Sequence, residues 1–178
     1  MAAVLKRGNK PTQAEFHAAI SSRSDRWFAA CLRITRSREL AEDAVQDALL
    51  SAWNKREQFQ QGAQLSTWIH RIAINSALQL IRKQRPGRFT ALDMDIESEE
   101  ESPEESKANI ELAKTLTEAC AHLSEIERVC FLLKHMEEWR LKEIAESLET
   151  NEGTVKQAIF RAVKKLRVRL GGLERNAS

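Results

Sequence analysis

The sequence lacks the features that would support a membrane span, a disulfide framework or a metal centre. No apolar run is long enough to cross a bilayer, and residues 1–10 lack the apolar core of a signal peptide, so we expect a cytoplasmic protein. The three cysteines, Cys31, Cys120 and Cys130, are an odd number among apolar neighbours, which is typical of core thiols in a reducing compartment. No Cys or His pair stands at zinc-ligand spacing, and we expect neither a metal nor another cofactor.

Patterns of β-structure are also missing. No stretch alternates polar and apolar residues for long enough to predict a strand, whereas helical spacing recurs along most of the chain. Pro86 and Gly87 interrupt it, and the acidic, serine-containing stretch that follows is too polar to bury itself. We therefore predict an all-α protein with two small helical domains, residues 12–86 and 108–171, joined by a flexible acidic linker at residues 87–107.

The net charge of +2 conceals a strong asymmetry along the chain. Residues 1–90 carry fifteen Lys or Arg against seven Asp or Glu, and residues 107–178 carry thirteen against eleven. Residues 91–106 carry eight acidic residues and no basic one. Two net basic segments on either side of an acidic linker indicate two domains that face the same polyanion.

Helix-start signals divide the first domain into four expected helices. A capping box from Thr12 to Glu15 opens the first, and a second carries the apolar residues between Trp27 and Ile34. Ser37 caps a third helix at about residues 39–54, whose polar face carries Glu42, Asp43, Gln46 and Asp47. Ser66 caps a fourth, which ends before Pro86. After the linker, helices resume near Lys107, and a capping box from Ser124 to Glu127 opens another.

The stretch from Leu141 to Leu166 has the pattern of a helix-turn-helix. Its first helix is short and apolar on one side, Asn151 is a good N-cap for a second helix, and residues 171–178 are expected to be a tail. The second helix is basic with no acidic residue between Gly153 and Leu170; its cations are Lys156, Arg161, Lys164, Lys165, Arg167 and Arg169. This bias favours duplex DNA binding, and the alternative is a packed helical hairpin with a solvated basic face.

The fourth expected helix carries a second candidate nucleic-acid surface. Trp68, Arg71 and Asn75 stand at i, i+3 and i+7, so that an aromatic ring, a cation and an amide share one face. This set suits an unpaired base, and the loop before it offers the amides of Gln60, Gln61 and Gln64. From the spacing alone, a core Trp68 with a solvated Arg71 is equally compatible.

Three segments resemble motifs of one protein family. Residues 41–53 resemble region 2.2 of the extracytoplasmic-function (ECF) sigma factors, group 4 of the sigma-70 family. Residues 66–75 resemble their regions 2.3 and 2.4, and residues 143–148 with 153–162 resemble region 4.2. The resemblance covers nearly all of residues 12–170 in the family's order. It implies a bacterial initiation factor, not an enzyme, that binds core RNA polymerase, directs it to promoter DNA and is held inactive by an anti-sigma factor.

The resemblance also implies roles for individual residues. Four match the surface that docks on the β′ clamp helices: Asp43, Gln46, Asp47 and Trp53. Six match the part that melts the minus-ten element and captures a flipped base: Gln60, Gln61, Gln64, Trp68, Arg71 and Asn75. Seven match contacts to the minus-thirty-five element in the major groove: Lys134, Thr154, Lys156, Gln157, Phe160, Arg161 and Lys164. The β flap is a further implied partner, and the linker corresponds to a segment that threads into polymerase channels, unless it is merely a solubilising tether.

Departures from the family pattern affect the expected promoter rather than the family. Glu149 and Thr150 replace the Gly and aliphatic residue usual in the turn, so we expect some backbone strain there. Ile74, Gln79 and Ala158 also differ from the common residues. Two rival functions are an autonomous repressor or activator and a protein-interaction module that sequesters another regulator; the first leaves the acidic face unexplained, and the basic run after Gly153 argues against the second.

Overall fold

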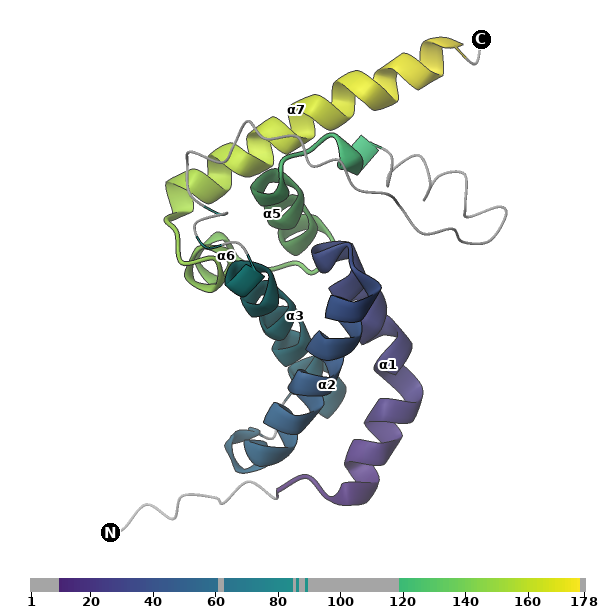
Figure 1. Ribbon diagram of the computed structural model, residues 1–178, viewed down its shortest axis with the longest axis vertical. Helices are drawn as coiled ribbons and strands as arrows, with labels where there is room; N and C mark the ends of the chain where they lie inside the picture. Colours follow the sequence, from purple (N-terminus) through teal and green to yellow (C-terminus); the bar gives the residue numbers. More distant parts are fainter. Residues whose placement is uncertain (1–9, 61–62, 85, 87–88, 90–118, 177–178) are drawn as a thin grey trace. The chain divides into compact units, whose positions relative to one another are not determined.

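The computed structural model describes residues 10–60, 63–84, 86, 89 and 119–176, with side chains to residue 171. Every regular element in these ranges is helical and no strand occurs among them, which confirms the all-α prediction (Figure 1). The chain divides into two compact units, residues 1–83 and 84–178, and each is described by itself. Most of the predicted linker lies outside the described residues. No helix in the described part of the chain has the length and hydropathy needed to span a bilayer.

The first unit contains α1 (Gln13–Thr35), α2 (Arg38–Asn54), the 3-10 helix η1 (Arg56–Gln58) and α3 (Leu65–Gln84). Two of its predicted start signals are confirmed. The Thr12 backbone N–H donates to Glu15 Oε2 at 2.7 Å, closing the capping box of α1. The Leu40 N–H donates to Ser37 Oγ at 3.3 Å at the start of α2. These local hydrogen bonds satisfy backbone donors that a helix N-terminus leaves without partners.

Two other predicted boundaries in this unit are wrong. Residues 13–35 form one helix rather than two, because the apolar spacing continues through the serine-rich middle and the Ser22 hydroxyl donates to the Ala19 carbonyl at 3.3 Å. Helix α3 begins at Leu65, so Ser66 lies inside its first turn and is not the cap. The N–H groups of Thr67 and Trp68 donate instead to the Gln64 carbonyl at 3.0 and 3.1 Å.

In the core of the first unit, two helices contribute large buried side chains and the third contributes small ones. Helices α1 and α3 bury large side chains, among them Trp27, Ile34, Ile69, Ile74 and Leu78. Helix α2 buries only alanines, each with 0% of its surface exposed: Ala41, Ala44, Ala48 and Ala52. Small residues let α2 approach its neighbours closely, and its outer face is left available for another partner.

The second unit packs α5 (Glu125–His135) and α6 (Leu141–Ser147) against α7 (Glu152–Asn176). The predicted capping box of α5 is confirmed, since the Ser124 N–H donates to Glu127 Oε2 at 3.0 Å and the Glu127 N–H to Ser124 Oγ at 3.4 Å. The buried face of α7 carries Val155, Ala158, Ala162 and Leu166. The predicted tail is wrong, because α7 continues through Gly171 to Asn176.

The cysteines are free thiols, as the sequence predicts. Cys31 and Cys130 are fully buried, and Cys120 is partly buried. Burial among apolar groups raises the pKa of the Cys130 thiol to about 12, because the thiolate would lose its hydration. These residues act as small apolar core residues.

Candidate nucleic-acid interface

Two local features of the turn in the helix-turn-helix set where α7 begins. Glu149 has a φ of 54°, a left-handed conformation that residues with a Cβ adopt at an energetic cost, so the expected strain is present. Asn151 then caps α7, and the Thr154 N–H donates to its Oδ1 at 2.8 Å. A Cβ on Gly153 would lie 3.0 Å from that same Oδ1, so glycine at this position leaves room for the cap. The predicted N-cap is confirmed.

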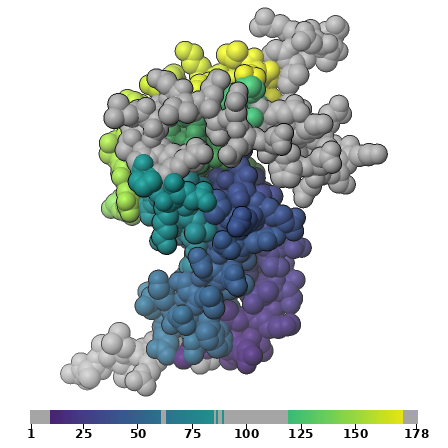
Figure 2. Space-filling model, in the orientation of Figure 1, coloured from purple at the N-terminus to yellow at the C-terminus, as the bar shows by residue number. Residues whose placement is uncertain are grey.

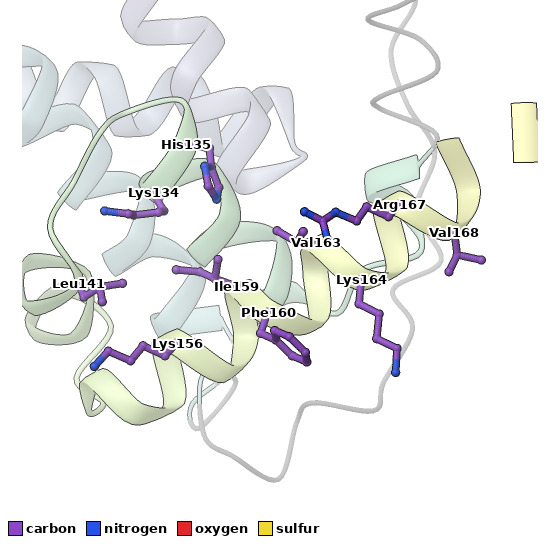
Figure 3. A pocket seen from close by; sticks show the side chains of 10 residues that line it. All are labelled: Lys134, His135, Leu141, Lys156, Ile159, Phe160, Val163, Lys164, Arg167 and Val168. Carbon is purple, nitrogen blue, oxygen red and sulfur yellow. The ribbon is translucent and has the colours of Figure 1, made fainter. Parts of the chain in front are cut away.

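A groove of about 630 Å³ runs along the outer side of α7 (Figure 3). Its apolar floor includes Leu141, Ile159 and Val163. Four cationic side chains line it: Lys134 from α5 and Lys156, Lys164 and Arg167 from α7. His135, Phe160 and Val168 complete the lining. A concave surface with cations on two helices suits a polyanion whose phosphates run along its edges.

Most of the residues predicted to read the minus-thirty-five element are accessible. Lys156, Gln157, Phe160, Arg161 and Lys164 are exposed on α7, and Lys134 is partly buried. Gln157 and Arg161 fall outside the groove lining, on the adjoining surface of α7. The Thr154 hydroxyl lies 3.3 Å from Asn151 Oδ1 and therefore takes part in the helix cap. Phe160 has 70% of its surface exposed, which is unusual for a phenylalanine with no contact role.

One cation of the basic run is paired inside the unit. Lys165 Nζ lies 2.9 Å from Glu127 Oε2, and the Glu127 side chain is 0% exposed. The stretch from Gly153 to Leu170 contains no acid, as the sequence shows, but Lys165 is offset by an acid from α5 that lies 38 positions earlier. Sequence reasoning also missed Arg167 and His135 as groove residues; Arg167 follows Lys156 at i+11, a spacing that returns to the same helix face.

Of the six residues predicted to melt the minus-ten element and capture a base, Trp68, Arg71 and Asn75 lie on α3. Arg71 and Asn75 are exposed, and Trp68 is partly buried. The Trp68 ring contacts the Phe59 ring, with centroids 5.5 Å apart and planes inclined at 54°. Phe59 stands directly before the glutamine-containing loop and was missed in the sequence analysis. Its contact holds the indole ring in place beside the loop, and this reduces the entropy lost when a base stacks on it.

The loop between η1 and α3 is only partly described. Gln60 and Gln64 are exposed, whereas Gln61 lies outside the described residues. The exposed amides can donate and accept hydrogen bonds, so they are compatible with contacts to base edges.

The outer face of α2 has a different chemistry. Asp43, Gln46 and Asp47 are exposed, and Trp53 is 37% exposed. This helix lies at the front of the first unit in the view of Figure 2, and its outer side is not covered by α1 or α3. An acidic surface repels DNA phosphates, so this face suits a protein partner. Within the described part of the chain, no cluster of His, Cys, Asp and Glu could hold a metal ion.

Comparison with known proteins shows that the segments carrying these surfaces match regions of one protein family. Residues 20–86 match the family model for sigma-70 region 2, and residues 113–166 match the model for sigma-70 region 4. The chain is 31% identical to the ECF RNA polymerase sigma factor SigM of Mycobacterium tuberculosis, over 78% of this chain and 68% of that protein. The chain belongs to the ECF sigma factors. It is also 29% identical to ECF sigma factor SigW of Bacillus subtilis, over 95% of this chain and 96% of that protein.

Solved structures share the fold of this sigma factor. The sigma factor RpoE from Bartonella quintana, solved in complex with the anti-sigma factor NepR, aligns with a TM-score of 0.59 at 24% identity, covering 88% of this chain and 97% of that one. CnrH, solved with the cytosolic domain of CnrY, aligns with a TM-score of 0.54 at 20% identity, covering 90% of each chain. As a member of its family, the protein is a transcription initiation factor that works with core RNA polymerase at promoter DNA.

Proposed function

We propose that three surfaces of this sigma factor act at successive stages of initiation. Domain 12–86 docks on the β′ clamp helices through the α2 face of Asp43, Gln46, Asp47 and Trp53. It captures a minus-ten base through Trp68, Arg71, Asn75 and the loop of Gln60, Gln61 and Gln64. Domain 108–171 reads the minus-thirty-five duplex through Lys134, Thr154, Lys156, Gln157, Phe160, Arg161 and Lys164, and it also contacts the β flap. Residues 87–107 link the two domains.

The observation that carries this proposal is the chemistry of the exposed side of α7. The helix buries Val155, Ala158, Ala162 and Leu166 within the unit, while cations and Phe160 border an open groove. Lysine and arginine neutralise phosphates, and an exposed phenylalanine can contact a thymine methyl group in the major groove. Arg161 on the adjoining surface can reach a phosphate or a guanine edge.

The proposed base-capture site is supported by a different arrangement. Trp68 is held by Phe59 next to the loop, and Arg71 and Asn75 are exposed one and two turns further along α3. Stacking on an indole ring does not require a specific base, whereas the amides and Arg71 can read one. The site therefore acts after the duplex opens.

Regulation by an anti-sigma factor is part of the proposal. It is supported by RpoE of Bartonella quintana, which shares this fold and was solved with the anti-sigma factor NepR. The protein is proposed to act in the cytoplasm, where its polymerase and its DNA are. The free protein is expected to bind promoter DNA weakly, because its net charge is only +2 and its two DNA-binding surfaces are spaced correctly only on polymerase.

Open-complex formation on fully duplex and pre-melted promoters tests the division of labour. With Arg161→Ala, closed-complex formation should fall by roughly tenfold, within the range of about 1–3 kcal/mol for a specific contact, and a minus-ten bubble should not fully restore it. With Trp68→Ala, initial binding should remain near normal, open-complex formation should fall by a similar factor, and the bubble should largely rescue it.

Two controls make this experiment specific. Trp68→Phe keeps an aromatic surface and should retain most of the melting activity. Arg23→Ala removes an exposed arginine of α1 that belongs to none of the proposed surfaces. If the bubble rescued Arg161→Ala and failed to rescue Trp68→Ala, the assignment of the two DNA surfaces would be reversed.

A further inference from the structure

The acidic face of α2 contains an apolar side chain that its proposed role does not yet use. Leu50 has 60% of its surface exposed. With Asp43, Gln46 and Asp47 it follows the spacing i, i+3, i+4 and i+7, so these four residues form one stripe along the helix. We propose that Leu50 is the apolar anchor of this face and inserts between cationic side chains on the polymerase surface that α2 binds; this rests on the proposed function of the face.

The core of the first unit does not explain Leu50. The side of α2 that packs inward consists of four alanines with no exposed surface. Leu50 lies on the opposite side, and burying it would remove an exposed leucine from water without any change to the fold. A few residues that become fully desolvated near the centre of an interface carry most of its affinity, and an exposed apolar side chain at the middle of a docking face can be one of them.

Trp53 is a less suitable anchor, although it stands on the same helix. Its ring forms a T-shaped contact with the Phe16 ring, with centroids 5.2 Å apart and planes inclined at 85°. The Arg56 guanidinium carbon lies 4.2 Å from the centroid of the Trp53 ring, and Arg56 Nη1 donates to the Trp53 carbonyl. These contacts cover much of the indole within the unit. Leu50 therefore has the larger exposed fraction of the two, 60% against 37%.

The charges beside Leu50 indicate the chemistry of its partner. Asp43 and Asp47 lie on the same stripe, and neither forms an ion pair among the residues that the structure describes. Glu42, at the edge of the stripe, is paired with Arg38 at 2.9 Å. The complementary surface is therefore an apolar recess bordered by Lys or Arg. In this arrangement, the aspartates accelerate the encounter and Leu50 slows dissociation.

The experiment measures association and dissociation of the full-length protein and purified core polymerase without DNA, at several salt concentrations. Leu50→Ala and Leu50→Asn should weaken binding by about tenfold or more, mainly through faster dissociation, as expected for truncation of an interface anchor. Leu50→Met keeps the apolar volume and should stay within about threefold of the parent. Asp47→Asn should instead slow association and reduce its salt dependence.

Thermal unfolding separates docking from folding. Since Leu50 is mostly exposed, its variants should unfold within about 4 °C of the parent, because surface substitutions usually change stability by no more than about 0.5 kcal/mol. Sedimentation of the free protein tests a second copy as the occupant: a dimer that Leu50→Asn dissociates, with unchanged core affinity, would overturn the proposal.

Failure of this inference differs from failure of the proposed function. If Asp43→Asn and Asp47→Asn weaken core binding while the Leu50 variants bind normally, only the anchor is refuted. If none of these variants changes core binding, the whole α2 face is wrongly assigned.

Discussion

Lys164 and Lys165 are adjacent on α7, yet neutralising them is expected to change two different properties. Lys164 is exposed and lines the groove, whereas Lys165 Nζ lies 2.9 Å from the buried carboxylate of Glu127. We consider Lys164→Gln and Lys165→Gln, which remove one charge each and keep a similar side-chain length. The first should change DNA binding and the second should change stability.

The DNA effect follows from counterion release. Each phosphate that a lysine neutralises contributes about 0.9 to the slope of log affinity against log salt concentration. Lys164→Gln should therefore make the slope shallower by about 0.9, so that a rise from about 50 to 200 mM salt weakens this variant about 3.5-fold less than the parent. Lys165→Gln should leave the slope unchanged. The assay is closed-complex affinity of the saturated holoenzyme on a duplex promoter.

The stability effect follows from the burial of Glu127. Loss of Lys165 leaves the charge of Glu127 without a cation, which costs about 3–5 kcal/mol when both partners are fully buried. Because the Lys165 side chain is 41% exposed, solvent screens the pair, and we expect a loss of about 1–3 kcal/mol. Calorimetry of the second unit's transition measures it. The double variant Glu127→Gln, Lys165→Gln should recover much of the loss, since Gln can keep the capping box without the buried charge.

The result that refutes this reasoning is specific. If Lys165→Gln makes the salt slope as shallow as Lys164→Gln does, Lys165 must leave Glu127 and bind a phosphate in the complex. A stable Lys165→Gln variant that shows no coupling to Glu127→Gln would likewise show that the ion pair does not position α7.

Two further predictions concern the folded protein alone. Glu149→Gly should remove the cost of the left-handed φ of 54° and raise the melting temperature of the second unit by roughly 2–6 °C. A lower melting temperature, measured by thermal unfolding, would show that contacts of the Glu149 side chain outweigh the strain. The raised pKa of Cys130, about 12 against 9.0 for a free thiol, means that only the unfolded thiol loses its proton between these values, so stability should fall as pH rises from about 9 towards 12. Urea unfolding at pH 8 and pH 10 should show a smaller fall for Cys130→Ala than for the parent, and equal falls would contradict the assignment.

The features that could be predicted from the sequence depend on residues that are close together along the chain. The caps at Thr12, Ser37, Ser124 and Asn151 are all present, because each pairs a side-chain acceptor with an N–H three residues later. The predicted division of residues 13–35 into two helices is wrong, and the serine-rich stretch around Ser22 lies inside one helix. Serine favours helix ends on average, but here the buried faces of α1 on both sides of it are in phase and keep the helix continuous.

Features set by tertiary contacts could not be predicted in this way. The sequence shows a continuous basic run on α7 but cannot show that Lys165 meets Glu127 from α5. Likewise, it marks Trp53 as a contact residue but cannot show that Phe16 and Arg56 cover much of its ring. Each of these contacts engages part of a side chain within its own unit, and so reduces what that residue can offer to a partner.

The sequence does contain a signal for residues that remain available to a partner. This signal is a large apolar residue that lies off the buried face of its helix. On α7 the buried residues follow one phase, from Val155 through Ala158 and Ala162, and Phe160 falls outside it. On α2 the buried alanines follow another single phase, and Leu50 falls outside that one. A large apolar residue out of phase with its own helix gains nothing from the core and exposes apolar surface to water in the free protein. A partner that covers the residue removes this cost, so the phase of the core can be used to select candidate contact residues as well as buried ones.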